Sequence, residues 1–239
     1  MLTHAMLFAA GLGTRMRPLT DQTPKALIEL DGKPLLEHAL ARFEAFGVAR
    51  VVVNTHHLAE PIAAYLARRR SRMEVVRSHE DVLLETGGGV MKARALLGDA
   101  PFFCANMDTL WLDGPTPALD RLRDAYDPAR MDTLLLLQPR ERTVGFAAPG
   151  DFGLTGDGVL TRGEARPYVA AGLYVVHPRA LAARKVERFS MAEVWLATQQ
   201  ADGTLPGRYG LVHDDDWLHV GTPAELAAAS AFLAARRTA

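Results

Sequence analysis

The chain has 239 residues, a length that fits one large α/β domain or one domain with an insertion. Hydrophobic residues make up 49% of it and charged residues 23%, as in an ordinary globular protein. The net charge of -1 argues against general attraction to nucleic acid or anionic membranes, and no apolar run is long enough for a membrane span. The first residues lack the pattern of a signal peptide, and the single Cys104 rules out an internal disulfide, so we expect a cytoplasmic protein.

The first half of the chain alternates short apolar segments with amphipathic ones. Strands are predicted at residues 4–10, 51–53, 73–76, 102–105 and 133–137, and helices at residues 34–47, 58–69, 90–97 and 119–126. Strands that are apolar throughout are buried on both faces, which indicates a parallel sheet covered by helices on each side.

Beyond Pro139 the pattern changes. Glycines and short β-like pieces between residues 145 and 176 predict hairpins over the edge of the sheet. A helix at 190–200, a β-like segment at 211–220 and a final helix with a Thr222–Glu225 capping box follow. We expect a single domain, 1–239, whose halves are residues 1–139 and 140–239.

A glycine turn follows the first predicted strand. Gly11 and Gly13 come directly after the apolar run, where backbone N–H groups can surround an anion. Met16 stands where a dinucleotide-binding fingerprint requires its third glycine, so that fingerprint is absent. The Gly32–Lys33 pair has no glycine five residues before it and is not a P-loop.

Two cations follow this turn. Arg15 comes directly after it, and Lys25 stands ten residues later behind Pro24. A guanidinium grips terminal phosphates in a bidentate way, whereas an ammonium acts as a point charge on one phosphoryl oxygen. The turn and the two cations together predict a site for a nucleoside triphosphate.

Several segments resemble a known family. AAGLGTRMRPLT and TPKAL, residues 9–20 and 23–27, are similar to the signature of sugar-1-phosphate nucleotidylyltransferases. Within that family, LETGGGV at 84–90, the Asn106–Asp108 pair and WLHVGTP at 217–223 most resemble bacterial N-acetylmuramate-1-phosphate uridylyltransferases. The resemblance implies a Rossmann-like αβα sandwich of the nucleotide-diphospho-sugar transferase type. Its sheet would be mixed but mainly parallel, with a small antiparallel elaboration.

The resemblance also implies site residues, transferred position by position. The expected nucleotide-binding residues are Ala10, Gly11, Gly13, Thr14, Arg15, Lys25, Gly87, Gly88 and Asn106. The expected catalytic residues are Arg15, Lys25 and Asp108, and the expected sugar-binding residues are Glu85, Asp151 and Gly172. Asp108 follows a predicted strand and would hold Mg²⁺, with Mn²⁺ as an alternative.

Two positions depart from the family pattern. His219 stands where relatives carry a second metal-binding aspartate, and histidine suits Mn²⁺ or Zn²⁺ better than Mg²⁺. It is either a substituted ligand, a phosphate partner or a packing residue, and the 214–216 aspartates are an alternative source of carboxylate. The family's sugar-phosphate lysine is missing, which leaves Arg162 or Arg166 for that role.

The expected reaction is UTP with N-acetylmuramate 1-phosphate giving UDP-N-acetylmuramate and pyrophosphate, a step in reuse of a cell-wall sugar. We expect a monomer or small homo-oligomer that binds neither nucleic acid nor membrane. One alternative is a hexose- or heptose-1-phosphate enzyme that uses another triphosphate. Another is a catalytically weak regulatory subunit that binds NDP-sugar, which His219 motivates; a NAD-dependent oxidoreductase ranks last.

Overall fold

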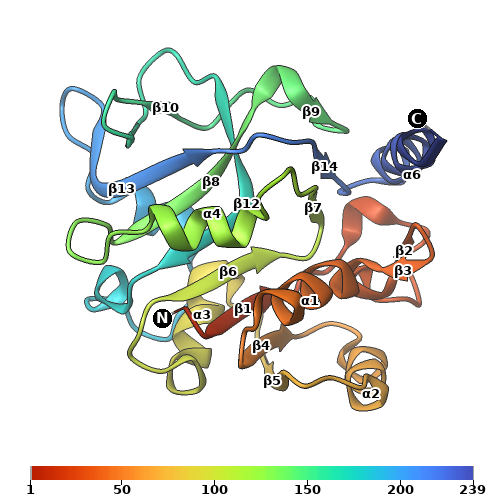
Figure 1. Cartoon of the computed structure of the whole chain (residues 1–239). Coiled ribbons are helices and arrows are strands. Elements are labelled where there is room, and N and C mark those ends of the chain that lie inside the picture. Colours follow the sequence, from red (N-terminus) through yellow and green to blue (C-terminus); the bar gives the residue numbers. More distant parts are fainter. Residues whose placement is uncertain (1, 239) are drawn as a thin grey trace.

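The computed structural model describes residues 2–238, which build a nine-stranded mixed sheet (Figure 1). Its strand order is β10-β11-β13-β8-β12-β6-β1-β4-β5. The strands are β1 His4–Phe8, β4 Arg50–Thr55, β5 Glu74–His79, β6 Phe102–Asn106, β8 Thr133–Pro139, β10 Gly153–Leu154, β11 Val159–Thr161, β12 Tyr168–Val176 and β13 Thr204–Val212. Within the described residues, only β11 and β12 run against the others, so the mixed, mainly parallel sheet is confirmed.

Helices cover both faces of this sheet. The α-helices are α1 Leu35–Phe46, α2 Ala59–Arg68, α3 Glu85–Leu97, α4 Ala118–Ala125, α5 Met191–Leu196 and α6 Pro223–Thr238. Ala5 and Leu7 of β1 pack with α1 and α4, whereas Met6 and Phe8 pack with α3 and α5. This alternation along one strand is what burial on both faces requires, and it confirms the αβα sandwich.

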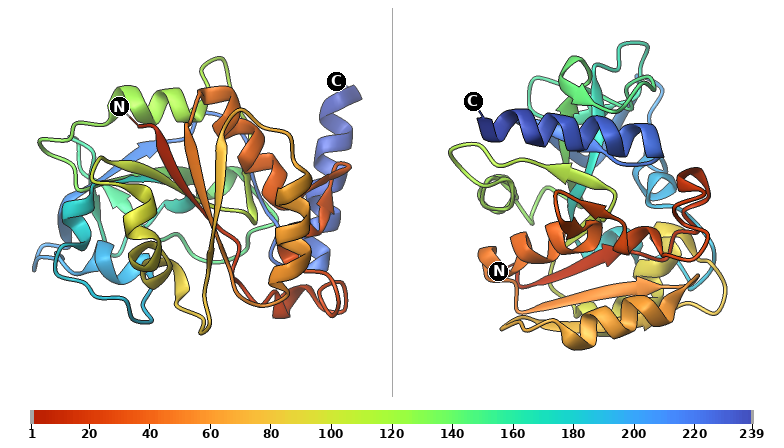
Figure 2. Two further views of the ribbon diagram at one scale, coloured as in Figure 1. Left: turned by 90° about the horizontal axis from the view of Figure 1, so that it is seen from below. Right: turned by 90° about the vertical axis from the view of Figure 1, so that its right-hand side faces the viewer.

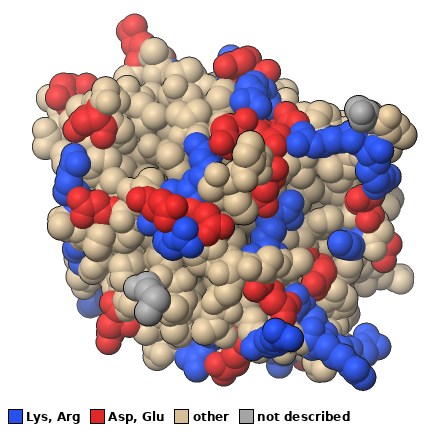
Figure 3. Space-filling model, in the orientation of Figure 1, with Lys and Arg blue, Asp and Glu red and all other residues tan. Residues whose placement is uncertain are grey.

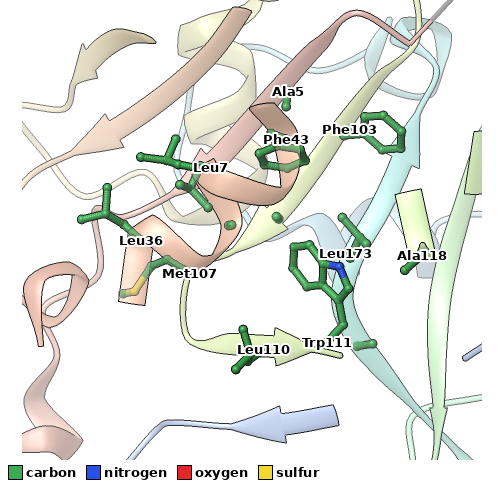
Figure 4. Packing of buried hydrophobic residues seen from close by; sticks show 14 of the residues in the cluster. Ala5, Leu7, Leu36, Phe43, Phe103, Met107, Leu110, Trp111, Ala118 and Leu173 are labelled. Atoms are coloured by element: carbon green, nitrogen blue, oxygen red, sulfur yellow. The ribbon is translucent and has the colours of Figure 1, made fainter. Parts of the chain in front are cut away.

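Helix α1 shows how the sequence sets an element and its packing. Pro34 precedes it, and Gly47 ends it with a φ of 92°, a conformation that favours glycine. Its apolar face is buried, and Phe43 lies 6.2 Å from Phe103 of β6, ring centre to ring centre (Figure 4). The predicted helix at 34–47 is therefore confirmed.

The second half is less peripheral than the sequence suggested. Strand β12 lies in the middle of the main sheet, between β6 and β8, and β13 pairs with β8 on the other side. The predicted 211–220 segment is split between β13 and β14 (Trp217–His219), which belong to different sheets. Strand β14 joins β7 (Thr109–Trp111) and β9 (Thr143–Val144) in a three-stranded sheet.

Small elements complete the fold. Strands β2 (Glu29–Leu30) and β3 (Lys33–Pro34) form a hairpin that lies beside α6 (Figure 2). The 3₁₀ helices are η1 Thr14–Met16, η2 Lys25–Leu27, η3 Arg140–Arg142 and η4 Pro178–Leu181.

None of the helices within residues 2–238 has the length and apolar character that crossing a lipid bilayer requires.

A partly buried ion pair fixes the start of β8. Arg208 of β13, only 4% exposed, donates to the Asp132 carboxylate at 2.6 Å, and Arg179 of η4 donates to the same carboxylate. Burial opposes ionisation of Asp132, but the two arginines outweigh it and hold the pKa of this carboxyl below its ordinary value. The ionised carboxylate of Asp132 thus links the start of β8 to β13 and to η4.

Replacing Asp132 with asparagine removes the charge and leaves Arg208 buried without its partner. We expect the free energy of unfolding at pH 7 to fall by roughly 2–4 kcal/mol. Because the folded-state pKa is lowered, this contribution is present above the unfolded pKa of about 4 and is lost as the pH falls through the folded value. Urea unfolding of both proteins at pH 7 and pH 3 checks this, and a difference in stability that stays constant with pH would contradict it.

Candidate active site

A cavity of about 470 Å³ opens where the carboxyl ends of β1, β4 and β6 meet. Phe8, Asn54 and Asn106 line it from the ends of these strands. In open α/β sheets, ligands bind at this edge. The predicted site residues that line the cavity are Ala10, Gly11, Gly13, Thr14, Arg15, Lys25, Glu85, Asn106 and Asp108.

The glycine turn depends on one residue. Gly13 has a φ of 65°, and a Cβ there would lie 3.1 Å from Cγ2 of Thr20 and 3.2 Å from Cβ of Lys25. The carbonyl of Gly13 accepts hydrogen bonds from Thr20 Oγ1 at 2.8 Å and from the Met16 N–H at 2.9 Å. Glycine is therefore required for the close approach that brings Lys25 beneath the turn.

Lys25 and Asp108 form an ion pair inside the cavity. Nζ of Lys25 lies 2.6 Å from Oδ2 of Asp108, and the two side chains are 7% and 23% exposed. Lys25 begins η2, and Asp108 follows β6, so residues 83 positions apart meet at the sheet edge. Each charge neutralises the other, and both lie beside the glycine turn.

Glu85 and Thr86, at the start of α3, form a further wall of the cavity. Glu85 begins α3 with a φ of 59°, a left-handed conformation that costs about 1 kcal/mol or more for a residue other than glycine. Its Oε1 accepts from Nε and Nη2 of Arg188, at 2.9 and 2.7 Å. The carboxylate predicted to accept from a sugar hydroxyl is thus held by an arginine at the rim.

The other predicted residues of this segment do not line the cavity. Gly87 and Gly88 lie in the first turn of α3, so the helix begins five residues earlier than predicted. Their N–H groups donate to the Phe189 carbonyl at 2.9 and 3.1 Å. A Cβ on Gly87 would lie 2.2 Å from the Phe189 ring, and one on Gly88 would lie 2.0 Å from the Glu187 carbonyl oxygen. These glycines accommodate the 187–189 segment.

Substituting Gly88 with alanine tests this packing. In a helix, alanine normally stabilises by roughly 0.5–1 kcal/mol relative to glycine. Here the contact with the Glu187 carbonyl reverses the sign, and we expect a lower melting temperature. Gly163→Ala, outside the helices, is the control for adding a methyl group without a clash, because nothing lies within 4 Å of its Cβ position. Thermal unfolding that ranks Gly88→Ala at or above the wild type would contradict the packing account.

Besides Gly87 and Gly88, three more predicted residues lie outside the cavity lining. Oδ2 of Asp151 accepts from the Ala170 N–H at 2.9 Å. Gly172 has a φ of 75°, and a Cβ there would lie 3.1 Å from Nδ2 of Asn106, so it borders a cavity residue. His219 is the third, and its ring packs against Trp217 at 6.0 Å between ring centres.

His219 nevertheless adjoins the cavity wall. Its Nδ1 lies 3.2 Å from Oε2 of Glu225, although the angles are not those of a hydrogen bond. Oε2 of Glu225 also accepts from the N–H of Gly221, which lines the cavity. A Cβ on Gly221 would lie 2.5 Å from Cε1 of His219 and 3.2 Å from Nη1 of Arg15. Histidine, glutamate and arginine thus converge on one glycine.

The residues considered as alternatives to His219 and to the missing sugar-phosphate lysine do not line the cavity. Asp214 pairs with Arg121 at 2.7 Å, and Asp215 and Asp216 pair with Arg236 of α6. Arg166 lines a separate surface hollow, and Arg162 is not part of the cavity lining.

Sequence reasoning missed several lining residues, among them Asn54, Met107, Ser190 and Gly221. Asn54 had a signal, because it is the polar residue that interrupts the apolar segment VVVNT. Ser190 had none, because it reaches the cavity only through the close contact of its segment with α3.

The acidic residue at the cavity, Asp108, suits a metal ion that is bound partly by the protein and partly by substrate phosphates. Across residues 2–238, no three histidine, cysteine or acidic side chains gather as a protein cage for an ion. Mg²⁺ is commonly held by one or two carboxylates, with substrate phosphates and water as the other ligands. Asp108 at the cavity fits that pattern.

Charged side chains of both signs share one face of the molecule. On the face seen in Figure 3, acidic and basic side chains are interspersed, and no broad region of one sign appears.

Comparisons with known proteins agree with this geometry. Residues 5–193 match the MobA-like NTP transferase domain family. The chain is 41% identical over 237 residues to N-acetylmuramate alpha-1-phosphate uridylyltransferase from Caulobacter vibrioides, with 96% of each chain covered. It is 28% identical to the mannose-1-phosphate guanylyltransferase catalytic subunit beta of Danio rerio, over 92% of this chain and 61% of that one.

Solved structures show the same fold. HddC from Yersinia pseudotuberculosis, complexed with GMP-PN, superposes with a TM-score of 0.76 at 19% identity, covering 97% of this chain and 100% of that one. A UDP-glucose pyrophosphorylase complexed with UDP-glucose also gives 0.76, at 17% identity, covering 99% and 100%. The chain belongs to the MobA-like NTP transferase family. Within it, the chain is a sugar-1-phosphate nucleotidyltransferase.

Proposed function

We propose that this enzyme transfers a uridylyl group from UTP to N-acetylmuramate 1-phosphate, which yields UDP-N-acetylmuramate and pyrophosphate. The observation that carries the proposal is the cavity in which the glycine turn, Arg15, Lys25 and Asp108 meet. The end-to-end similarity to the Caulobacter enzyme supports this choice of base and sugar. The reaction belongs to reuse of a cell-wall sugar, and we propose that it takes place in the cytoplasm.

The proposed role of the protein is to position the substrates and neutralise charge. N–H groups of residues 10–14 and the Arg15 guanidinium would hold the β and γ phosphates. Lys25, beneath the turn, would face the α-phosphoryl group, where charge develops as pyrophosphate leaves. An oxygen of the sugar phosphate attacks the α-phosphorus in line, and no general base is needed because that oxygen is already anionic.

Asp108 would hold the metal, Mg²⁺ or alternatively Mn²⁺. When bound, such an ion neutralises charge on phosphate oxygens. In the structure, Nζ of Lys25 contacts the Asp108 carboxylate at 2.6 Å. We propose that the triphosphate draws Lys25 to its phosphates and thereby frees Asp108.

His219 is proposed as a further metal ligand or phosphate partner. Metal-bound histidines usually present their second ring nitrogen to a carboxylate. Nδ1 of His219 lies 3.2 Å from Glu225, which would leave Nε2 for that contact. On the sugar side, Glu85, Asp151 and Gly172 are proposed contacts.

One screen tests the proposed function and its rivals. Pyrophosphate release is measured with each of the four common ribonucleoside triphosphates against N-acetylmuramate, N-acetylglucosamine, glucose, mannose and heptose 1-phosphates. We expect the highest kcat/KM for UTP with N-acetylmuramate 1-phosphate. Preference for another pair would establish a different nucleotidyltransferase. NDP-sugar binding without pyrophosphate release from any pair would establish a regulatory subunit.

A further inference from the structure

A buried chain of hydrogen bonds, which the proposed chemistry does not use, runs from the cavity lining at Asn54 into the protein. The Ala9 N–H donates to Oδ1 of Asn54 at 2.8 Å, and Nδ2 of Asn54 donates to Oε1 of Glu80 at 2.7 Å. The Leu84 N–H donates to Oε2 of Glu80 at 2.9 Å. Asn54 is 2% exposed and Glu80 is fully buried. This relay crosses the ends of β1, β4 and β5, which are neighbours in the sheet.

The donors and acceptors of the relay fix one another. A backbone N–H can only donate, so Asn54 must turn its carbonyl oxygen to Ala9 and its amide to Glu80. The Leu84 N–H also requires an acceptor. Glu80 therefore has to accept on both side-chain oxygens, which a carboxylate does and an amide cannot. This is why an acidic residue is buried at position 80.

The relay joins the two walls of the cavity. Ala9 immediately precedes the turn whose residues 10–15 line one wall. Leu84 immediately precedes Glu85 and Thr86, which line the other. A shift of Asn54 or Glu80 would therefore change the distance between the walls.

The third glycine of the LETGGGV segment is explained by the same relay. A Cβ on Gly89 would lie 2.8 Å from Oε1 of Glu80 and 2.9 Å from Nδ2 of Asn54. Only glycine lets α3 pass this close to the two side chains. Gly89 thus serves the relay, whereas Gly87 and Gly88 serve the packing of residues 187–189.

We propose that Asn54 and Glu80 are positioning residues for the triphosphate, and that they set the spacing between its phosphate-binding turn and the Glu85–Thr86 wall. This inference rests on the proposed function, because it takes a nucleoside triphosphate as the ligand of that turn. Neither residue performs a chemical step. They fix the geometry of the cavity walls, so their replacement should weaken the affinity for the triphosphate.

The fixed polarity of the relay permits a swap experiment. Glu80→Gln sets an amide against either the Asn54 amide or the Leu84 N–H, and Asn54→Asp sets two carboxylates against each other. The double variant Asn54→Asp/Glu80→Gln restores all three hydrogen bonds with the middle one reversed, because the new amide at position 80 donates to the new carboxylate at position 54. Leu122→Ala in α4 is the control, because Leu122 is buried in the core away from the cavity lining and its loss lowers stability alone.

Titration calorimetry with Mg²⁺ and whichever of the four triphosphates the wild type binds most tightly gives the Kd, and thermal unfolding gives the melting temperature. We expect each single variant to weaken the Kd at least about tenfold, because small misplacements at a binding site are costly. The double variant should return to within about threefold of the wild type, and Leu122→Ala should melt earlier with an unchanged Kd.

A folded Glu80→Gln that binds the triphosphate as the wild type does would overturn the proposal. A double variant no better than the single variants, or one that does not fold, would also overturn it. If the single variants do not fold but the double variant folds and binds, the relay is supported. A wild type that binds none of the four triphosphates would instead refute the proposed function, so the two failures are distinguishable.

Discussion

The contact between Lys25 and Asp108 is the constraint on which the site depends. Their 2.6 Å ion pair lies at the sheet edge, beside a turn that only glycine at position 13 allows. Lys25 is proposed to contact a phosphoryl oxygen of the triphosphate. Asp108 is proposed to bind the metal ion that accompanies the triphosphate. The two charges satisfy each other, so neither lies in the cavity without a partner.

The surrounding fold holds these two residues in place from both sides. Asp108 follows β6, which lies between β1 and the antiparallel β12, and its carbonyl accepts from the Val220 N–H. The glycine turn follows β1, and the Asn54–Glu80 relay ties that turn to the start of α3. The ends of β1 and β6 thus position the glycine turn and Asp108 at the same edge of the sheet.

The first half of the fold could be predicted because its signals are local. Helix α1 has its proline, its apolar face and its final glycine within fourteen residues of sequence. Strand β12 could not be placed, because an apolar strand carries no record of which neighbours it pairs with. The start of α3 was predicted too late, since three glycines disfavour a helix locally. Their presence is explained by contacts with Phe189, Glu187 and Glu80, which are distant in sequence or in other elements.

The candidate site likewise contains residues that the sequence could predict and residues that it could not. The turn, Arg15, Lys25 and Asp108 were found from their spacing and resemblance, and they line one cavity. His219 was expected as a substituted ligand, a phosphate partner or a packing residue. It adjoins the cavity through Gly221 and lies beside Glu225, six residues away. Glu80 was missed because its buried position depends on strand order, which the residues around it do not reveal.

The most direct test of the account is Mn²⁺ binding, measured by electron paramagnetic resonance without nucleotide, in the wild type, Lys25→Met and Asp108→Asn. If Lys25 neutralises Asp108 until the triphosphate arrives, the wild type binds the ion weakly. Lys25→Met then binds it at least about fivefold more tightly, because a close positive charge is gone, and Asp108→Asn does not bind it. Equal binding by the wild type and Lys25→Met, or binding retained in Asp108→Asn, would contradict the account.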